Sequence, residues 1–260
     1  MLLAVDIGNL TVAVGLFQGK KLVRGWKIMT DREKTSDEYE VLLVNLFQYA
    51  KIDLEKVEGV ILSSVVPPLT PVFQAASENL FREKALVVGP GLRTGMPILY
   101  ENPLEVGADR VVAALAAYEK YGGPSIVVDF GTATTFDAVS DCGEYLGGAI
   151  APGIQISAEA LYLKTAKLPR IEIRKPKKAI GRTTVASMQS GLYFGYIGLV
   201  TKIVSEIQAE LGKKTTVVST GGFGGQITPE ISVIDHFEPD LVLEGLRILY
   251  DKNRKVEEAP

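Results

Sequence analysis

Two aspartates stand where an apolar run ends and a glycine-containing turn begins. The first is Asp6 in LLAVDIGN, and the second is Asp129 in SIVVDFGT. A carboxylate at such a position can bind a cation, and the backbone N–H groups of the turn can bind phosphate oxygens. The two stretches therefore predict a site for phosphates and a cation. On the first stretch alone, a simpler alternative is that Asp6 and Asn9 only build the turn through hydrogen bonds to the backbone.

The similarity between the two stretches extends further along the chain at a constant offset of 123 residues. An apolar run, Asp, Gly, an apolar strand and a second glycine turn recur in the same order. The matched positions are Asp6 and Asp129, Gly8 and Gly131, Val12 and Thr135, Leu16 and Val139, Leu22 and Tyr145, and Gly25 and Gly148. A turn seldom needs the same acid twice. We therefore expect two homologous half-domains, residues 1–112 and 113–260, whose hairpins face each other across a cleft.

The hydrophobic pattern predicts the elements that position these hairpins. Each half begins with three strands and continues with alternating helices and strands. In the first half we expect strands at 2–5, 12–16, 21–27, 60–65 and 85–88, and helices at 36–50 with Ser36 as its cap, at 68–81 and at 104–121, the last bridging the halves. After three strands, the second half has helices at 154–162, 184–211 and 239–253 and a strand at 216–219; the charged end NRKVEEAP is expected to fray. This order predicts an α/β protein with a duplicated ribonuclease-H-like (actin-like ATPase) fold.

The composition narrows the classes of function. The chain has 260 residues, a net charge of −3, one cysteine and one histidine. These counts disfavour nucleic-acid binding, disulfide scaffolds, zinc sites and catalysis by Ser-His-Asp or Cys-His groups. No apolar stretch reaches the length of a membrane span, so we expect a cytoplasmic protein without a membrane partner. The Walker pattern is absent, but VVSTGGFGG at 217–225 follows a strand and suggests room for the adenosine of a nucleotide.

Further motifs carry a resemblance to a known family. They are YENPLEVGADRVVAA at 100–114, GGAIAPG at 147–153, GRTTVASMQSGLYFGYIG at 181–198 and STGGFGG at 219–225. Together with the two Asp-x-Gly hairpins, this set resembles the type III pantothenate kinases, which belong to the superfamily of acetate kinase, sugar kinases, chaperones and actin. The resemblance implies ATP-dependent phosphorylation of the primary hydroxyl of pantothenate, the first step toward coenzyme A.

The resemblance also implies roles for individual residues. Asp109 would be the general base, and Asp129 would bind a monovalent cation, K⁺ or NH₄⁺. The phosphates of ATP, with Mg²⁺ at Asp6, would meet Asp6, Ile7, Gly8, Asn9, Leu10, Thr11, Val12 and Ala13, and Thr132 from the second hairpin. The pantothenate site would comprise Tyr100, Gly107, Ala108, Asp109, Arg110 and Thr184. Leu10 stands where the family has Thr or Ser, and Thr183 where it has Asn.

The residues around Asp109 suit a base for phosphoryl transfer without the family resemblance. Gly107 lets the backbone approach a substrate, and Arg110 can hold a polar acceptor. The alternative meaning of the Asp-Arg pair is an exposed first turn of a helix.

The resemblance implies a homodimer, and Gly191, Gly195 and Gly198 give one face of a helix small residues for close packing. A non-catalytic regulatory relative and another small-molecule kinase of the superfamily stay open as alternative functions.

Overall fold

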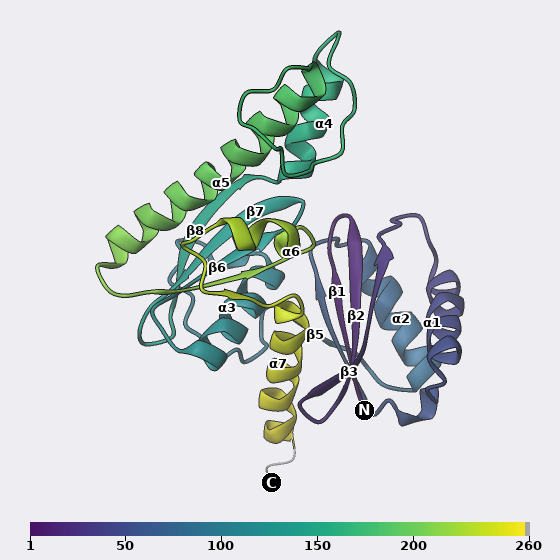
Figure 1. Cartoon of the computed structure of the whole chain (residues 1–260). Helices are drawn as coiled ribbons and strands as arrows, with labels where there is room; N and C mark the ends of the chain where they lie inside the picture. Colours follow the sequence, from purple (N-terminus) through teal and green to yellow (C-terminus); the bar gives the residue numbers. More distant parts are fainter. Residues whose placement is uncertain (258–260) are drawn as a thin grey trace. The chain divides into compact units, whose positions relative to one another are not determined.

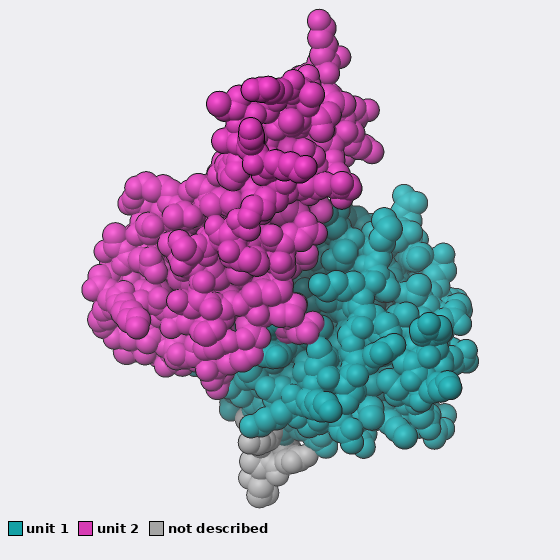
Figure 2. All heavy atoms as spheres, in the orientation of Figure 1, with its two compact units in different colours: residues 1–95, 102–116, 241–260 teal, residues 96–101, 117–240 magenta. Residues whose placement is uncertain are grey.

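The computed structural model describes residues 1–257, and within it the chain forms two compact units (Figure 2). Neither unit is a contiguous half. Unit 1 contains residues 1–95 and 102–116 and the segment that begins at Leu241, and unit 2 contains residues 96–101 and 117–240. The C-terminal helix belongs to unit 1 because it packs on the first sheet. The expected boundary at 112/113 falls inside a helix, and as the division between duplicated halves it stays a prediction.

Unit 1 is built on a five-stranded mixed sheet of order β3-β2-β1-β4-β5 (Figure 1). Its elements are β1 (Leu2–Ile7), β2 (Thr11–Gln18), β3 (Lys21–Met29), α1 (Ser36–Ala50), the 3-10 turn η1 (Leu54–Lys56), β4 (Gly59–Ser64), α2 (Leu69–Phe81), β5 (Leu86–Val87), the 3-10 turn η2 (Pro103–Glu105), α3 (Ala108–Tyr121), which continues into unit 2, and α7 (Leu241–Glu257). Helices α1 and α2 cover one face, where Tyr39, Phe47 and Phe73 join the alternate apolar residues of β1, β2 and β4. α7 packs against β1, β2 and β4.

Unit 2 repeats this plan with the order β10-β9-β6-β7-β8. Its elements are β6 (Ser125–Phe130), β7 (Ala133–Val139), β8 (Tyr145–Pro152), α4 (Ile154–Lys164), α5 (Thr184–Leu211), β9 (Thr216–Thr220), α6 (Gly224–Ile227), the 3-10 turn η3 (Thr228–Glu230) and β10 (His236–Phe237). Tyr193, Tyr196 and Val200 of α5 pack on Ile126 and Val128 of β6. In each unit two antiparallel pairs are followed by two parallel pairs, which confirms the duplicated ribonuclease-H-like fold.

The pairing of the strands corrects one part of the repeat. Four residues separate the last pair of the first hairpin, Ile7 and Val12, whereas three separate Phe130 and Thr134 in the second. The offset of 123 therefore holds for Asp6, Gly8, Leu22 and Gly25, but inside β2 and β7 it becomes 122. Val12 corresponds to Thr134 and Leu16 to Ala138, so the matches expected with Thr135 and Val139 are wrong by one residue.

The connection to the third strand restores the agreement between the copies. Four residues separate Phe17 from its partner Leu22, whereas five separate Val139 from Tyr145, so the offset returns to 123 in β3 and β8. Both sheets also carry a bulge. β2 shifts register between Leu16 and Phe17, and β7 shifts between the corresponding Ala138 and Val139. A bulge inserts one extra residue in one strand of a pair and bends it locally. Its recurrence at the same place in both sheets is independent support for the duplication.

Several expected element ends are also corrected. Asp6 lies inside β1, paired with Ala13 and Ser63, and not at the tip of the hairpin. α1 is capped by Thr35, whose side chain forms a capping box with Glu38, and not by Ser36. α3 begins at Ala108 and not near Leu104, since the Asn102 side chain accepts from Leu104 N and closes η2 first.

The expected fraying of the C-terminal segment stays a prediction. α7 runs from Leu241 to Glu257, so helical structure covers most of the charged segment NRKVEEAP. The remaining residues, 258–260, lie outside the described residues. No helix within residues 1–257 combines the length and the apolar character that crossing a membrane requires.

Candidate active site

The first hairpin places a carboxylate and a hydroxyl side by side at the carboxyl ends of two parallel strands. Asp6 of β1 is in register with Ser63 of β4, and both point away from the core that α1 and α2 cover. Ser63 is fully buried, and its hydroxyl has no hydrogen-bond partner among the described residues. A buried hydroxyl without a partner is costly, so its place beside Asp6 suits a bound group. Sequence analysis missed Ser63, because only the register of β1 and β4 brings it to Asp6.

The turn that follows Asp6 is held open by glycine. Gly8 N donates to Thr11 O at 3.0 Å, and a Cβ at Gly8 would lie 2.9 Å from that oxygen, so only glycine fits without a shift. Asn9, Leu10 and Thr11 form the exposed part of the turn, and Leu10 is 51% exposed. Val12 and Ala13 then return the chain into β2.

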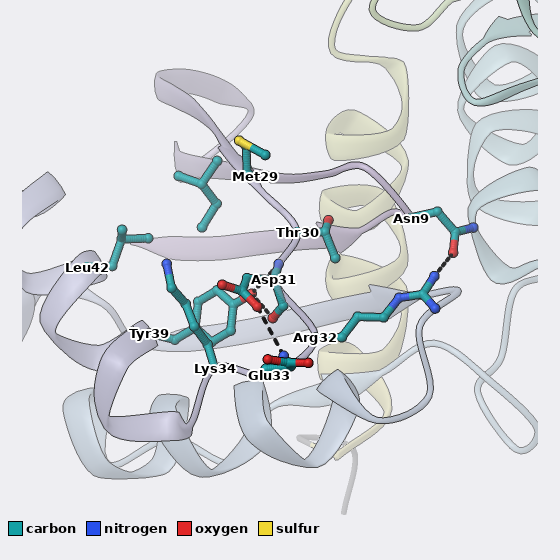
Figure 3. Close-up of a pocket in the computed structure, with 10 residues that line it drawn as sticks. Asn9, Met29, Thr30, Asp31, Arg32, Glu33, Lys34, Tyr39 and Leu42 are labelled. Carbon is teal, nitrogen blue, oxygen red and sulfur yellow. Dashed lines mark hydrogen bonds between the residues drawn. The ribbon is translucent and has the colours of Figure 1, made fainter. Parts of the chain in front are cut away.

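Two residues beyond β3 brace this turn from the side, and sequence analysis missed both. Thr30 Oγ1 donates to Gly8 O at 2.7 Å, and Arg32 Nη2 donates to Asn9 Oδ1 at 2.8 Å. Figure 3 shows Arg32 reaching Asn9 beside a cavity of about 560 Å³ that residues 28–34 line with Tyr39 and Leu42. The segment TDREK carries no motif, so nothing in its sequence marks it as a neighbour of the first hairpin.

Asp109 is closely packed at the start of α3. Arg110 N donates to Asp109 Oδ1 at 2.9 Å, and a Cβ at Gly107 would lie 2.5 Å from the same oxygen. Gly107 is therefore required for this position of the carboxylate. The Gly107 Cβ position also lies 3.7 Å from Val65 Cγ1, and Val65 N donates to Ile7 O at 3.0 Å. Unit 1 thus brings Gly107, Ala108, Asp109 and Arg110 to the strand ends that carry Asp6.

The second hairpin surrounds Asp129 with oxygen atoms and glycine. Asp129 is in register with Thr135 of β7 on one side and with Thr220 of β9 on the other. A Cβ at Gly221, where φ is +95°, would lie 2.4 Å from Asp129 Oδ1. A carboxylate flanked by two hydroxyls is a donor set that suits a hard cation. Thr220 corresponds to Ser63 in unit 1, so both aspartates have a hydroxyl-bearing neighbour on the parallel strand.

Unit 2 also carries the other expected site residues. Thr132 lies in the turn after Asp129, where its carbonyl accepts from Gly153 N at 3.2 Å just before α4. Tyr100 packs its ring on β8, 3.4 Å from the position of a Cβ at Gly147. Thr184 is the first residue of α5 and is exposed.

The third glycine-rich turn lines a cavity of about 400 Å³ in unit 2. Gly222, Phe223 and Gln226 form one wall, and Gln155, Ala158, Glu159 and residues 170–173 complete it. This volume is typical of a small-molecule site, and the lining combines an aromatic ring with amide and charged groups. Across residues 1–257, no three His, Cys, Asp or Glu side chains gather into a group able to hold a metal ion.

Comparison with known proteins assigns the family. Residues 2–206 match the family model described as type III pantothenate kinase. This chain belongs to the type III pantothenate kinase family. The type III pantothenate kinase of Moorella thermoacetica is 54% identical over 97% of this chain and 100% of its own length. That of Geobacter sulfurreducens is 52% identical over 98% of this chain and 100% of its own. The expected family and the expected kinase activity are confirmed.

Solved structures agree on the fold of this pantothenate kinase. An inorganic polyphosphate/ATP-glucomannokinase from Arthrobacter sp. aligns with a TM-score of 0.51 at 14% identity, covering 96% of this chain and 98% of that one. At this identity the likeness concerns the fold alone. It supports the α/β fold shared by sugar kinases and actin-like ATPases.

The two departures from the family pattern have different structural meanings. Thr183 is the N-cap of α5, and its side chain accepts from Ala186 N at 3.1 Å. Asn and Thr are both favoured at this position, so the pantothenate kinase keeps the cap. Leu10 instead places an exposed apolar side chain in the longer first turn, and Thr11 is the nearest hydroxyl in sequence.

Burial raises the pKa of the Asp109 carboxyl above its ordinary value, against the hydrogen bond from Arg110 N and the Arg110 charge, which lower it. A raised pKa makes the ionised carboxylate a stronger proton acceptor. It also means that the ionised form destabilises the fold, since the unfolded chain solvates the charge better.

Asp109→Asn is therefore expected to keep or raise the thermal stability of this pantothenate kinase at neutral pH. The penalty of the ionised carboxylate is present above the folded-state pKa and vanishes below the unfolded-state pKa of about 3.9. The difference in Tm between variant and unmodified protein should shrink as the pH is lowered toward that value. Melting curves across this pH range measure it. A variant that is less stable at neutral pH than the unmodified protein would contradict the expectation.

Proposed function

We propose that this pantothenate kinase transfers the γ-phosphoryl group of ATP to the primary hydroxyl of pantothenate, with Asp109 as the general base. The observation that carries the proposal is the environment of Asp109. The pKa of its carboxyl is raised, and its position leaves no room for a side chain at Gly107. It lies at the start of α3, near the strand ends that carry the Asp6 hairpin. The carboxylate would accept the hydroxyl proton as the oxygen attacks phosphorus. Phosphoryl transfer needs little more than such an oriented acceptor and neutralised phosphate charge.

The first hairpin would hold the phosphates. Asn9, Leu10 and Thr11 are exposed in this turn, so their backbone would face the phosphates, and Thr30 and Arg32 brace the turn. Mg²⁺, when bound, neutralises phosphate charge during transfer. The residues fit this ion, because Asp6 supplies a carboxylate and Ser63 a buried hydroxyl without a protein partner among the described residues. Thr132 would contact the phosphates from the second hairpin.

The cavity beside the third glycine-rich turn would take the adenosine. Phe223 offers a ring face for stacking, and Gln155 and Gln226 offer hydrogen bonds to base or ribose. The pantothenate would meet Tyr100, Thr184 and residues 107–110, where Arg110 offers a charged donor for the pantothenate carboxylate. We place this reaction in the cytoplasm, where ATP is plentiful.

The reaction is tested with purified protein, ATP, Mg²⁺ and K⁺ and a panel of pantothenate, pantetheine and simple sugars. The phosphorylated product is identified by mass spectrometry. Phosphopantothenate as the main product supports the proposal. A phosphorylated sugar would instead show another small-molecule kinase, and no product from any acceptor would favour a non-catalytic regulatory relative.

Asp109→Asn should lower turnover roughly 10²- to 10⁴-fold, the usual cost of removing a general base. The KM for ATP should change much less, because Asp109 acts on the acceptor. Asp37→Asn, an exposed carboxylate on α1, is the matched control and should keep full activity. Wild-type turnover in a folded Asp109→Asn variant would show that the base is another group.

Asp129→Asn should weaken activation by K⁺ or NH₄⁺, because the carboxylate supplies the negative charge of the oxygen set around the proposed ion. Initial rates are measured over a series of KCl and NH₄Cl concentrations at constant ionic strength. NaCl replaces them in the control series. Equal rates of the unmodified enzyme in sodium, potassium and no monovalent salt would remove the cation from the proposal.

A homodimer along α5 is the last part of the proposal. Gly191, Gly195 and Gly198 are exposed, and apart from their chain neighbours and the adjoining helix backbone, no atom of the described residues lies within 4 Å of a Cβ built at any of them. Phe194, 41% exposed, stands on the same stretch of helix. Such a surface lets a second helix approach closely and gain dispersion contacts.

Gly195→Leu should shift the dimer toward monomer in sedimentation experiments at micromolar concentration, because the larger side chain keeps the helices apart. Activity should fall with the dimer content, if the partner helps to close the pantothenate site. Glycine has a low helix propensity, so Gly195→Ala controls for that effect and should stay dimeric. A fully active monomer of the unmodified protein would exclude the dimer.

A further inference from the structure

A fully buried carboxylate in unit 2 has no part in the chemistry described so far. Asp137 of β7 has no exposed surface. Its Oδ1 accepts from Tyr145 Oη at 2.7 Å, and its Oδ2 accepts from Thr135 Oγ1 at 3.1 Å. Burying a carboxylate is costly and is tolerated where hydrogen bonds hold it.

The fold itself does not require an acid at this position. The register of the duplicated sheets places Gly15 of β2 where β7 has Asp137, since each pairs with a glycine of the third strand, Gly25 and Gly148. Unit 1 forms the same sheet and the same bulge without the carboxylate. The sheet therefore forms without an acid at this position, and among the two matched positions only that of unit 2 carries one.

One side of Asp137 leads to the proposed cation site. Thr135 stands opposite Asp129 across β6 and β7, and directly paired side chains on one face lie about 5 Å apart at Cβ. A threonine hydroxyl has one proton and two lone pairs. Because the proton is donated to Asp137, the oxygen can offer only lone pairs toward Asp129. That is the orientation that a cation ligand requires.

The other side of Asp137 leads to the proposed pantothenate site. Tyr145, whose hydroxyl holds Asp137, is fully buried and pairs with the segment before Tyr100. Tyr145 N donates to Pro97 O, and Leu99 N donates to Tyr145 O, both at 2.8 Å. The Tyr100 ring packs two residues further along β8, at Gly147. The position of Tyr145 thus sets the position of Tyr100.

We propose that Asp137 is a positioning residue that couples the cation site to the pantothenate site. Through Thr135 it orients a hydroxyl oxygen toward the cation at Asp129, and through Tyr145 it fixes the segment that carries Tyr100. This inference rests on the proposed function, because the roles of Asp129 and Tyr100 belong to it.

Separate variants test the two sides. Thr135→Val removes the hydroxyl at nearly constant shape, and should raise the half-activating K⁺ concentration about five- to tenfold while the pantothenate KM changes less. Thr135→Ser keeps the hydroxyl and should restore the K⁺ response. Tyr145→Phe should raise the pantothenate KM by a similar factor with a smaller effect on K⁺. Asp137→Asn should raise both.

The control is Tyr121→Phe, which removes another tyrosine hydroxyl that donates to a carboxylate of unit 2, that of Glu238. If Asp137 were merely structural, Asp137→Asn would lower the stability, as we expect of Tyr121→Phe, and would leave the pantothenate KM and the K⁺ response unchanged. Two readouts do not depend on turnover. They are the rise in Tm of each variant with KCl relative to NaCl, and pantothenate affinity by calorimetry without ATP.

The results separate the inference from the proposed function. If the unmodified protein phosphorylates pantothenate but neither Thr135→Val nor Tyr145→Phe shifts its expected parameter, the coupling is overturned. If Asp137→Asn does not fold, Thr135→Val and Tyr145→Phe still test the two sides of the coupling. If the unmodified protein does not phosphorylate pantothenate, the proposed function fails, and the Tm and calorimetric readouts decide the coupling: an unchanged KCl effect and unchanged pantothenate affinity in both variants overturn it.

Discussion

The parallel pairing of β1 with β4, and of β6 with β9, is the constraint on which the site depends. It brings an aspartate to the carboxyl end of each central strand and sets a hydroxyl beside it, Ser63 beside Asp6 and Thr220 beside Asp129. After each aspartate, a turn that contains glycine leads into the antiparallel neighbour strand, so backbone groups of the turn lie near the carboxylate. In the proposed function a cation at each aspartate would offset the cost of a carboxylate near buried strands.

The duplicated sheets keep this geometry while their hairpins diverge. The first turn is one residue longer, and its Asn9, Leu10 and Thr11 are exposed. The shorter second turn keeps Asp129 between Thr135 and Thr220. The connection from β7 to β8 is one residue longer than that from β2 to β3, which offsets the difference, so β3 and β8 return to matching register.

The carboxylates of Asp137, fully buried, and Asp109, partly buried, lie in different environments. Asp137 is held by two hydroxyl donors, as a structural or positioning group needs. At Asp109 desolvation outweighs the hydrogen bond from Arg110 N, so its pKa is raised. A carboxylate held in its charged form at a cost to stability is what the proposed general base requires.

The sequence by itself determined most of the alternation of strands and helices, the two Asp-x-Gly hairpins, the helix from 184 to 211 and the family, but not the short elements α6 and β10, because apolar periodicity and glycine act locally and a two-residue strand shows no period. Sheet register and side-chain packing are set by residues far apart in the chain, and only the tertiary structure decided them. It placed Ser63 and Thr220 beside the aspartates, Arg32 on Asn9, and Asp137 between Thr135 and Tyr145. It also moved the match of β2 with β7 by one residue and attached α7 to the first sheet. A one-residue change in a turn leaves the local pattern of each strand intact, so its effect becomes visible only when the strands pair.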